Sequence, residues 1–213
     1  MRLILIGPPG SGKGTQAKLL SKRLGLTHIA TGDMLRTAIA RGTPAGKKAE
    51  PYVKNGQLAP DDLVNEVVAE RFRLDPQPQF VFDGYPRTAV QAAALDAALK
   101  ELGQNIDAVI FLNVEDEEIV HRISGRRICP KCQTSYHLVS NPPTKEPGKC
   151  DQCGTALVLR DDDREDKVRK RLKDYRSMTL ELKPYYLKQG LEKEIQAQGD
   201  IEAIYGAILE AIR

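Results

Sequence analysis

The sequence predicts an α/β fold in which a parallel sheet of five strands is flanked by helices on both faces. Two observations carry this prediction. Apolar runs at residues 3–6, 79–82 and 108–112 have the length and character of buried strands, and each is followed by a segment with helical periodicity. Strands that are apolar on both faces are typical of parallel sheets covered by helices. Residues 27–30 and 195–199 supply two weaker strand candidates.

Composition places the chain among globular proteins of one core with small inserts. It has 213 residues, of which 41% are hydrophobic. Its formal net charge is only +3, so no strongly basic field indicates a nucleic-acid partner. The first apolar run is too short for a secretory signal, and no stretch approaches the roughly 20 residues of a membrane span. We therefore expect a cytoplasmic protein without a membrane partner.

A phosphate-binding loop follows the first strand. Residues 7–15 read G-P-P-G-S-G-K-G-T, and a helical pattern begins directly after them. The glycines let backbone N–H groups converge on one point, at which the next helix also directs its positive dipole end. Lys13 adds a full charge for the β- and γ-phosphates, so the core is expected to be P-loop NTPase-like. The loop residues expected to hold the nucleotide are Gly10, Ser11, Gly12, Lys13, Gly14 and Thr15.

The loop departs from its common form at one position. A hydroxyl that binds Mg²⁺ usually follows the lysine, whereas here Gly14 follows Lys13 and Thr15 comes one residue later. The variant G-x-P-G-x-G-K-G-T resembles nucleoside monophosphate kinases, and adenylate kinases most closely. Further motifs extend this resemblance over residues 1–205. It implies that the loop residues above bind ATP.

Residues 31–59 are predicted to form a helical insert between the first two strong strands. One helix begins at residues 31–33, and another begins at 43–44 with a hydroxyl at its cap and proline in its first turn. The strings T-G-D-M-L-R and N-G-x-L are similar to the monophosphate-binding region of adenylate kinases. The AMP contacts that this similarity implies are Thr31, Arg36, Gln57, Leu58 and Ala59.

An acidic residue ends the second strong strand. Asp83 lies at the carboxyl end of residues 79–82, where open α/β sheets bind their ligands. It is our candidate for organising Mg²⁺ and the waters that the ion retains. The motif D-G-[YF]-P-R-T-x-x-Q is complete from this residue onward. The further AMP contacts that the family match implies are Gly84, Tyr85, Pro86, Arg87 and Gln91.

Residues 125–163 are predicted to form a lid that carries a metal. Cys129-x₂-Cys132 and Cys150-x₂-Cys153 form the four-thiolate pattern of a structural zinc ribbon. Iron is the alternative occupant. Because four thiolates complete a tetrahedron, His137 is expected to form hydrogen bonds rather than bind the metal. The segment resembles the lid of zinc-bearing bacterial adenylate kinases, which implies ATP contacts from Ser135 and Tyr136.

Four arginines flank this lid. Arg122 and Arg126 lie on and just beyond a helix predicted at residues 115–124, so both guanidinium groups point toward a common place. The strings H-R-I-x-G-R-R and R-x-D-D, with the basic stretch after it, are similar to the arginine-bearing motifs of adenylate kinases. The match implies that Arg122 and Arg126 bind ATP, and that Arg160 and Arg171 bind AMP.

The C-terminal part is predicted to hold one long charged helix from Arg164 to about Gln189. A strand at 195–199 and an amphipathic helix at 201–212 follow. The family implies an adenine contact from the backbone of Ile201. Here the usual D-G-x-x ending is replaced by Q-G-D-I.

The resemblance implies the reaction ATP·Mg + AMP ⇌ 2 ADP, which balances adenine nucleotides. No catalytic base is required, because a monophosphate with a second pKa near 6 is already largely ionised at pH 7. The difficulty is to hold two polyanions in line, which arginine and lysine side chains achieve. The residues expected to carry catalysis are Lys13, Arg36, Asp83, Arg87, Arg122, Arg160 and Arg171.

The implied organisation is a core with two movable inserts. The core comprises residues 1–30, 60–124 and 164–213, with an AMP-binding insert at 31–59 and the zinc-binding lid at 125–163. In the family both inserts close over the nucleotides and exclude water that would hydrolyse ATP. The resemblance also implies a monomer with ATP, AMP and ADP as its small-molecule partners.

Three other classes of protein were weighed against this one. UMP and CMP kinases share the loop and D-G-[YF]-P-R but tend to have a short lid without zinc. A GTPase needs N-K-x-D to bind guanine, and this tetrapeptide does not occur. A zinc-ribbon RNA-binding module on a degenerate ATPase core is the non-enzyme alternative. The ribbon offers little aromatic-basic interleaving beyond Lys131 and Tyr136, and the loop lysine is intact.

Overall fold

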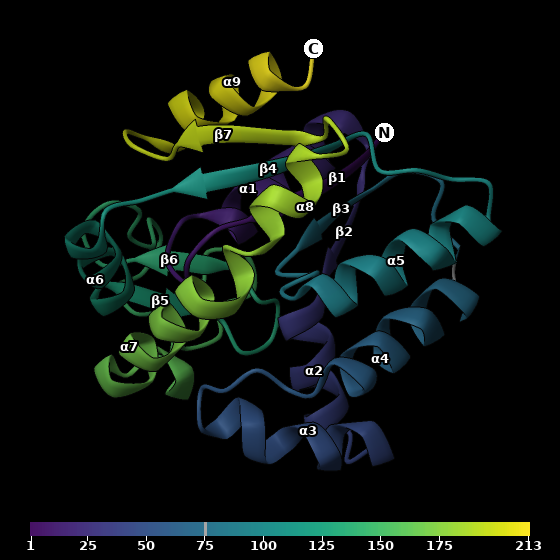
Figure 1. The fold of residues 1–213 in the computed structure, drawn as a ribbon. Helices are drawn as coiled ribbons and strands as arrows, with labels where there is room; N and C mark the ends of the chain where they lie inside the picture. Colours follow the sequence, from purple (N-terminus) through teal and green to yellow (C-terminus); the bar gives the residue numbers. More distant parts are fainter. Residues whose placement is uncertain (75) are drawn as a thin grey trace.

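The computed structural model of the chain describes residues 1–74 and 76–213. Five parallel strands form the central sheet, as predicted, and the structure shows their order to be β2-β3-β1-β4-β7 (Figure 1). The strand that carries the phosphate-binding loop therefore lies at the centre, and the carboxyl ends of all five strands meet at one edge. The strands are β1 (Arg2–Ile6), β2 (Thr27–Ala30), β3 (Phe80–Asp83), β4 (Ala108–Asn113) and β7 (Glu192–Gln196).

Alternate residues of the strands pack against two separate layers of helices. Ile4 and Ile6 belong to a core that includes side chains of α4 (Asp61–Leu74), α5 (Ala89–Glu101) and α8 (Leu182–Leu187). Leu3 and Leu5 point to the opposite face and pack with α1 (Lys13–Leu24) and α9 (Ile201–Ala211). This two-sided burial explains why the strong strands read as uninterrupted apolar runs. Among the described residues, no helix is long and apolar enough to cross a membrane.

A helical insert joins β2 to β3. It contains α2 (Thr31–Ala40) and α3 (Pro44–Lys54), which pack against each other and against α4 (Figure 1). The Thr43 hydroxyl caps α3, since its Oγ1 accepts a hydrogen bond from the Gly46 N–H at 3.0 Å. The start predicted from the Thr-Pro pair is therefore confirmed.

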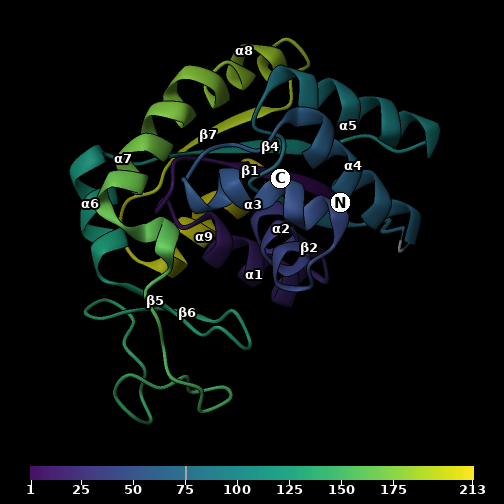
Figure 2. The same cartoon turned by 90° about the horizontal axis from the view of Figure 1, so that it is seen from below.

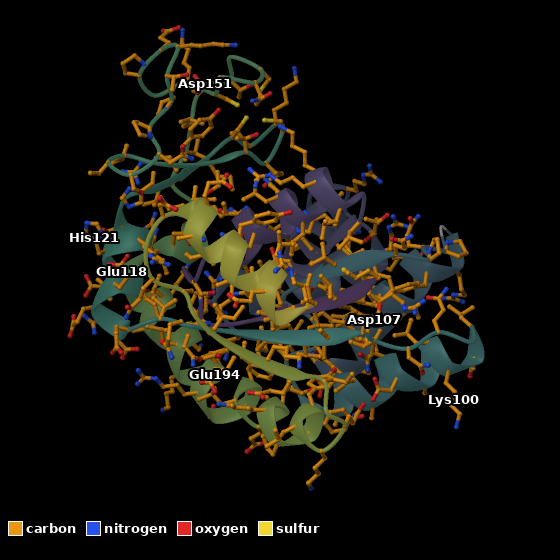
Figure 3. All side chains as sticks on the ribbon, turned by 90° about the horizontal axis from the view of Figure 1, so that it is seen from above. Lys100, Asp107, Glu118, His121, Asp151 and Glu194 are labelled. Carbon is orange, nitrogen blue, oxygen red and sulfur yellow. The ribbon has the colours of Figure 1, made fainter. Side chains whose placement is uncertain are left out.

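A second insert projects from the body between α6 (Asp116–Ser124) and α7 (Glu165–Asp174). It carries the antiparallel strands β5 (Arg126–Ile128) and β6 (Ser135–His137), and it ends in a 3₁₀ turn at Asp161–Asp163. Figure 2 shows these strands set apart from the helical layers, and Figure 3 shows Asp151 at the outer tip of the insert. The boundaries predicted for the core and its two inserts stay predictions.

The prediction of one continuous helix from Arg164 to about Gln189 is wrong. α7 ends at Asp174, a π-helical turn covers Tyr175–Thr179, and α8 begins at Leu182. Pro184 contributes to the break, because a proline inside a helix has no N–H for the i→i−4 hydrogen bond and its ring clashes with the carbonyl group four residues before it. Here Pro184 lies in the first turn of α8, where both effects are tolerated.

The last strand lies earlier than predicted, at Glu192–Gln196 rather than 195–199. It is an edge strand that pairs with β4 alone, in a register that places Val109 opposite Glu192. Edge position leaves its polar side chains in solvent, so hydrophobicity did not reveal it. The weak candidate at residues 27–30 is a full strand, β2, at the other edge.

Candidate active site

A cavity of about 1060 Å³ opens at the carboxyl ends of the strands, and side chains from the core and from both inserts line it. Small-molecule pockets typically span about 300–1,000 Å³, so this cavity lies at the upper end of that range. Most of the predicted site residues line it. They are Gly10, Gly12, Lys13, Gly14, Thr15, Thr31, Arg36, Gln57, Leu58, Ala59, Asp83, Gly84, Pro86, Arg87, Gln91, Arg122, Arg126, Ser135, Tyr136, Arg160, Arg171 and Ile201.

Two predicted site residues have side chains away from this lining. Ser11 is fully buried beneath the loop, where its Oγ lies 3.3 Å from the Lys13 Nζ. The Tyr85 side chain is 1% exposed and packs on Phe82, while its hydroxyl donates to the Asn65 Oδ1 at 2.8 Å. The side chains of Ser11 and Tyr85 therefore do not face the cavity.

The phosphate-binding loop positions Lys13 over its own carbonyl groups. The Lys13 Nζ donates to the Gly7 and Pro8 carbonyl oxygens at 2.7 and 2.8 Å. Burial lowers the pKa of Lys13 to about 7, together with nearby arginines and against the opposing charge of Asp83. Helix α1 begins after Gly12, whose φ of 93° is readily adopted only by glycine. A loop lysine and a helix N-terminus thus face the cavity as predicted.

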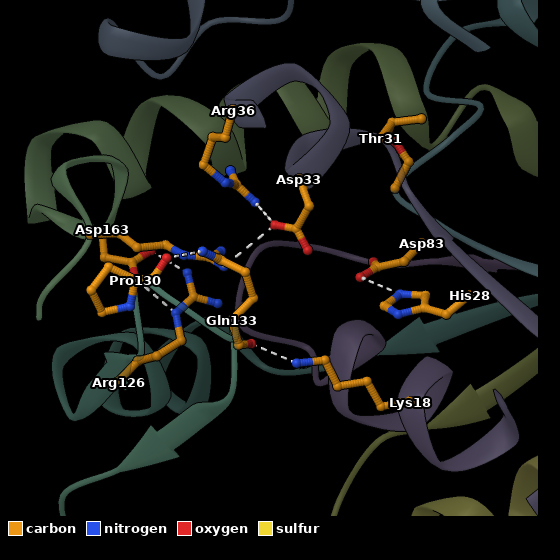
Figure 4. A network of polar contacts seen from close by, with 12 residues as sticks. Lys18, His28, Thr31, Asp33, Arg36, Asp83, Arg126, Pro130, Gln133 and Asp163 are labelled. Carbon is orange, nitrogen blue, oxygen red and sulfur yellow. Dashed lines mark hydrogen bonds and ion pairs between the residues drawn. The ribbon is translucent and has the colours of Figure 1, made fainter. Parts of the chain in front are cut away.

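Asp83 ends β3 beside the loop and stays ionised. Burial by itself raises its pKa, but a contact with His28 and the charge of Lys13 together hold the pKa below its ordinary value. The His28 Nε2 lies 3.7 Å from the Asp83 Oδ2, and Figure 4 shows the two side chains facing each other. A Cβ on Gly14 would lie 3.0 Å from the same Oδ2. The carboxylate thus occupies the space that a hydroxyl after Lys13 would need.

Two arginines from different inserts converge on Asp33 of α2. The Arg36 Nη2 lies 2.6 Å from the Asp33 Oδ1 (Figure 4), and the Arg160 Nη2 lies 3.6 Å from the same oxygen. Arg36 comes from the helical insert, whereas Arg160 comes from the far end of the lid. The cavity therefore brings together cations that are distant in sequence, as the family match implied.

A second carboxylate, Asp163, gathers two more arginines. Its side chain is fully buried, accepts from the Arg126 Nε at 2.7 Å, and lies 3.7 Å from the Arg171 Nη1. A buried carboxylate paired in this way balances part of the positive charge at the cavity wall. It joins the start of the lid to α7.

The lid contacts the core beside the phosphate-binding loop. The Lys18 Nζ of α1 donates to the Gln133 carbonyl oxygen at 2.6 Å (Figure 4), and the Gln133 Oε1 lies 3.4 Å from the Arg160 Nη2. Within the core, Arg122 on α6 donates to the Ala197 carbonyl oxygen at 2.9 Å. The lid therefore lies over the side of the cavity where the loop phosphates would sit.

The four cysteines converge in the lid, about one point. One Sγ from each of Cys129, Cys132, Cys150 and Cys153 lies within 4.8 Å of all the others. Three of these Sγ pairs lie 3.4–3.7 Å apart. The His137 Nδ1 instead accepts backbone N–H groups from residues 139 and 140, so the prediction that it forms hydrogen bonds is confirmed.

Comparison with known proteins agrees with this geometry. The adenylate kinase family model matches residues 5–191. The chain belongs to the adenylate kinase family. An adenylate kinase of Archaeoglobus fulgidus is 49% identical over 217 aligned residues that span both proteins completely. Those of Methanothrix thermoacetophila and Moorella thermoacetica are 47% and 48% identical over 213 residues, covering all of this chain and 98% of each relative.

Family membership confirms three predictions made from the sequence. The fold is the α/β P-loop type with a five-stranded parallel sheet, and the chain is a phosphotransferase. It also confirms that the resemblance seen in the loop and in D-G-[YF]-P-R extends over the chain. The individual roles of the site residues stay predictions.

Sequence reasoning missed the acidic residues that hold the cations in place. Asp33 and Asp163 both lie inside motifs that were noted only for their neighbours, T-G-D-M-L-R and R-x-D-D. An acid placed among arginines in a phosphate site was the available signal. His28 and Asp61 lie outside the motifs that were assigned a role, so only the structure reveals their contacts.

Proposed function

We propose that this chain reversibly transfers the terminal phosphoryl group of ATP·Mg to AMP, giving two ADP. The observation that carries the proposal is the convergence of Lys13, Asp83 and arginines from both inserts on one cavity of about 1060 Å³. Two nucleotides brought end to end need a shared site lined with positive charge. This role maintains the balance of adenine nucleotides in the cell.

The proposed division of labour follows the position of each cation. Lys13 and the loop N–H groups hold the β- and γ-phosphates of ATP, with Arg122 and Arg126 on the lid side. Arg36, Arg87, Arg160 and Arg171 hold the AMP phosphate and the phosphoryl group in transfer. Arginine suits these positions because its planar fork binds phosphate oxygens in pairs and stays charged. Catalysis then consists of alignment and stabilisation of developing charge.

Asp83 is the residue that we expect to organise Mg²⁺. The contact with His28 and the nearby charge of Lys13 keep its carboxylate ionised, and it lies beside the phosphate-binding loop. Carboxylate oxygens are the ligands that suit this ion, which usually keeps several waters. When bound with ATP, Mg²⁺ neutralises phosphate charge at the point of transfer.

The four lid cysteines are proposed to bind zinc with a structural role. A tetrahedral ion with Zn–S distances of about 2.3 Å needs sulfur atoms about 3.8 Å apart. Three Sγ pairs 3.4–3.7 Å apart, with all four sulfur atoms within 4.8 Å of one another, suit this arrangement. Four thiolates leave no position for a substrate or a reactive water. The metal therefore stabilises the lid and takes no part in phosphoryl transfer.

A coupled assay with ATP against AMP, CMP, UMP and GMP tests the function. We expect AMP to be preferred over CMP and UMP by at least about a hundredfold in kcat/KM, because a mismatched base leaves buried polar groups unpaired. Comparable rates with UMP would overturn the assignment in favour of a pyrimidine nucleotide kinase. Size-exclusion chromatography with light scattering tests the proposed monomer.

A further inference from the structure

The side-chain amide of Gln91 is held by two partners of opposite hydrogen-bonding type. Its Oε1 accepts from the Arg87 backbone N–H at 2.8 Å, and its Nε2 donates to the Asp61 Oδ1 at 2.8 Å. The side chain is 2% exposed and lies in the lining of the cavity. Gln91 is on α5, whereas Asp61 is the first residue of the neighbouring helix α4 (Figure 1).

These partners permit only one orientation of the amide. A backbone N–H can only donate and a carboxylate oxygen accepts, so exchanging the amide oxygen and nitrogen would disrupt both contacts. Asp61 is itself held by the Thr88 hydroxyl, which donates to its other oxygen at 2.9 Å. The Thr88 Oγ1 in turn accepts from the Gln91 backbone N–H at 3.2 Å. The three residues form a closed ring of contacts that fixes the amide.

The fixed amide can still make two hydrogen bonds. An amide oxygen has two lone pairs and its nitrogen has two N–H groups, so the contacts among the described residues leave one of each for a ligand. Adenine presents an N–H donor on its 6-amino group beside a ring-nitrogen acceptor, which is the edge that a glutamine amide reads in a bidentate way. Hypoxanthine and guanine carry an oxygen acceptor at position 6, which faces the same amide oxygen unfavourably.

We infer that Asp61 is a positioning residue that determines the specificity for the acceptor base, by holding the Gln91 amide in the orientation that matches adenine. The inference rests on the proposed function and adds a residue that does not touch the nucleotide. Without the Asp61 oxygen, only the Arg87 N–H opposes reversal of the amide. A reversed amide offers its N–H to the 6-oxygen of inosine or guanosine monophosphate.

The test compares kcat/KM for AMP with kcat/KM for inosine 5′-monophosphate, whose base differs from adenine only at position 6 and the protonation of N1. In Asp61→Ala we expect the ratio of the two values to fall by at least about tenfold, since a hydrogen bond to a charged group is lost. Asp61→Asn is expected to keep the ratio within about threefold. Its Oδ1 can accept from Gln91 while its Nδ2 donates to Thr88.

Asp62→Ala is the matched control, because it removes a charge from the same first turn of α4 but carries an exposed side chain. Its ratio should equal that of the unaltered chain. General loosening of α4 would lower both kcat/KM values together and leave their ratio unchanged. Should Asp61→Ala fail to fold, Asp61→Ser carries the same expectation, because its hydroxyl ends short of the carboxylate oxygen positions.

Two results would overturn the inference while leaving the proposed function intact. One is a folded Asp61→Ala or Asp61→Ser variant with an unchanged ratio, and the other is an equal fall in Asp62→Ala. A chain that does not transfer phosphate to AMP at all would instead overturn the proposed function, and the inference with it.

Discussion

The two inserts cover the same cavity but are stabilised in different ways. In the insert of α2 and α3, Leu35 and Ala49 are buried in the main core cluster beneath the sheet. In the lid, the buried cluster consists of Cys129, Tyr136 and Cys150, with Cys153 and Leu157 packed against it. Lid side chains such as those of residues 138 and 139 are instead exposed, by 53% and 77%.

This difference shows that a segment that covers the cavity can be stabilised with or without apolar packing. The helical insert extends a core that already exists, so its stability comes with that of the sheet. The lid buries too little apolar surface to fold by itself, and metal binding supplies such segments with much of their folding free energy. Loss of the metal should therefore affect the lid and spare the insert.

The largest expected effect comes from removing one positive charge of the site while both inserts stay in place. If both inserts mainly enclose a site whose cations do the chemistry, removing one cation must cost more than loosening either insert. Arg87→Ala should lower kcat by about three orders of magnitude, as for other arginines that meet transition-state charge. Arg169→Ala is the matched control, because its side chain is 66% exposed and pairs with Glu165 at 2.7 Å. It should change the rate less than about threefold. Equal losses would show that individual arginines have been assigned wrongly.

The next effect is the pH dependence of ATP·Mg binding, which arises from Lys13 in the core. Because burial lowers the pKa of Lys13 to about 7, the free lysine loses its proton as the pH rises above 7. Phosphates favour the charged form, so binding of ATP·Mg should take up a proton and weaken by up to about tenfold per pH unit between pH 7 and 9. Calorimetry across this range measures both quantities. Lys13→Arg keeps its charge at every pH and should show neither effect. Proton uptake that persists in this variant would assign it to another group.

Removal of the metal tests most directly whether the lid, unlike the helical insert, depends on metal binding for its stability. Cys129→Ser, or stripping with a strong chelator, should lower the thermal midpoint by about 4–8 °C if about 2 kcal/mol of stability is lost. The kinase rate well below the midpoint should survive, and protease should cut the lid first. Calorimetry, assays at low temperature and limited proteolysis followed by mass spectrometry decide the matter. A metal-free chain with an unchanged midpoint and no activity would mean that the metal acts in catalysis.

The smallest effect concerns the packed insert. Gly46 lets α3 approach α2 closely, since a Cβ there would lie 2.1 Å from the Ala38 carbonyl oxygen. Gly46→Ala should separate the two helices at a cost of about 1–3 kcal/mol and raise KM for AMP several-fold, with KM for ATP unchanged. Lys48→Ala, an exposed change on the same helix, should alter neither constant. A rise in KM for ATP instead would show that the inserts are not independent.

Local chemistry in the sequence determined most of the fold and the kinds of residue at the site. Buried parallel strands must be apolar on both faces, so β1, β3 and β4 were readable, and the loop around Lys13 carries its own phosphate-binding geometry. Four cysteines in two knuckles likewise specify a metal pattern by spacing alone. The edge strand β7 was placed too late in the sequence, because solvent exposure removes the hydrophobic signal. The break before Pro184 was missed, because the charge pattern on both sides of it is helical.

Only the tertiary structure decided which partners hold these residues. Asp33 meets Arg160 across 127 positions of sequence, and Gln91 meets Asp61 on another helix, because the sheet brings strand ends and both inserts to one edge. A sequence motif records which side chains are present, whereas a hydrogen bond or ion pair depends on atoms a few ångströms apart. Those separations arise only when the helices pack. The orientation of the Gln91 amide, and the pairing of each arginine with a carboxylate, are therefore properties of the folded chain.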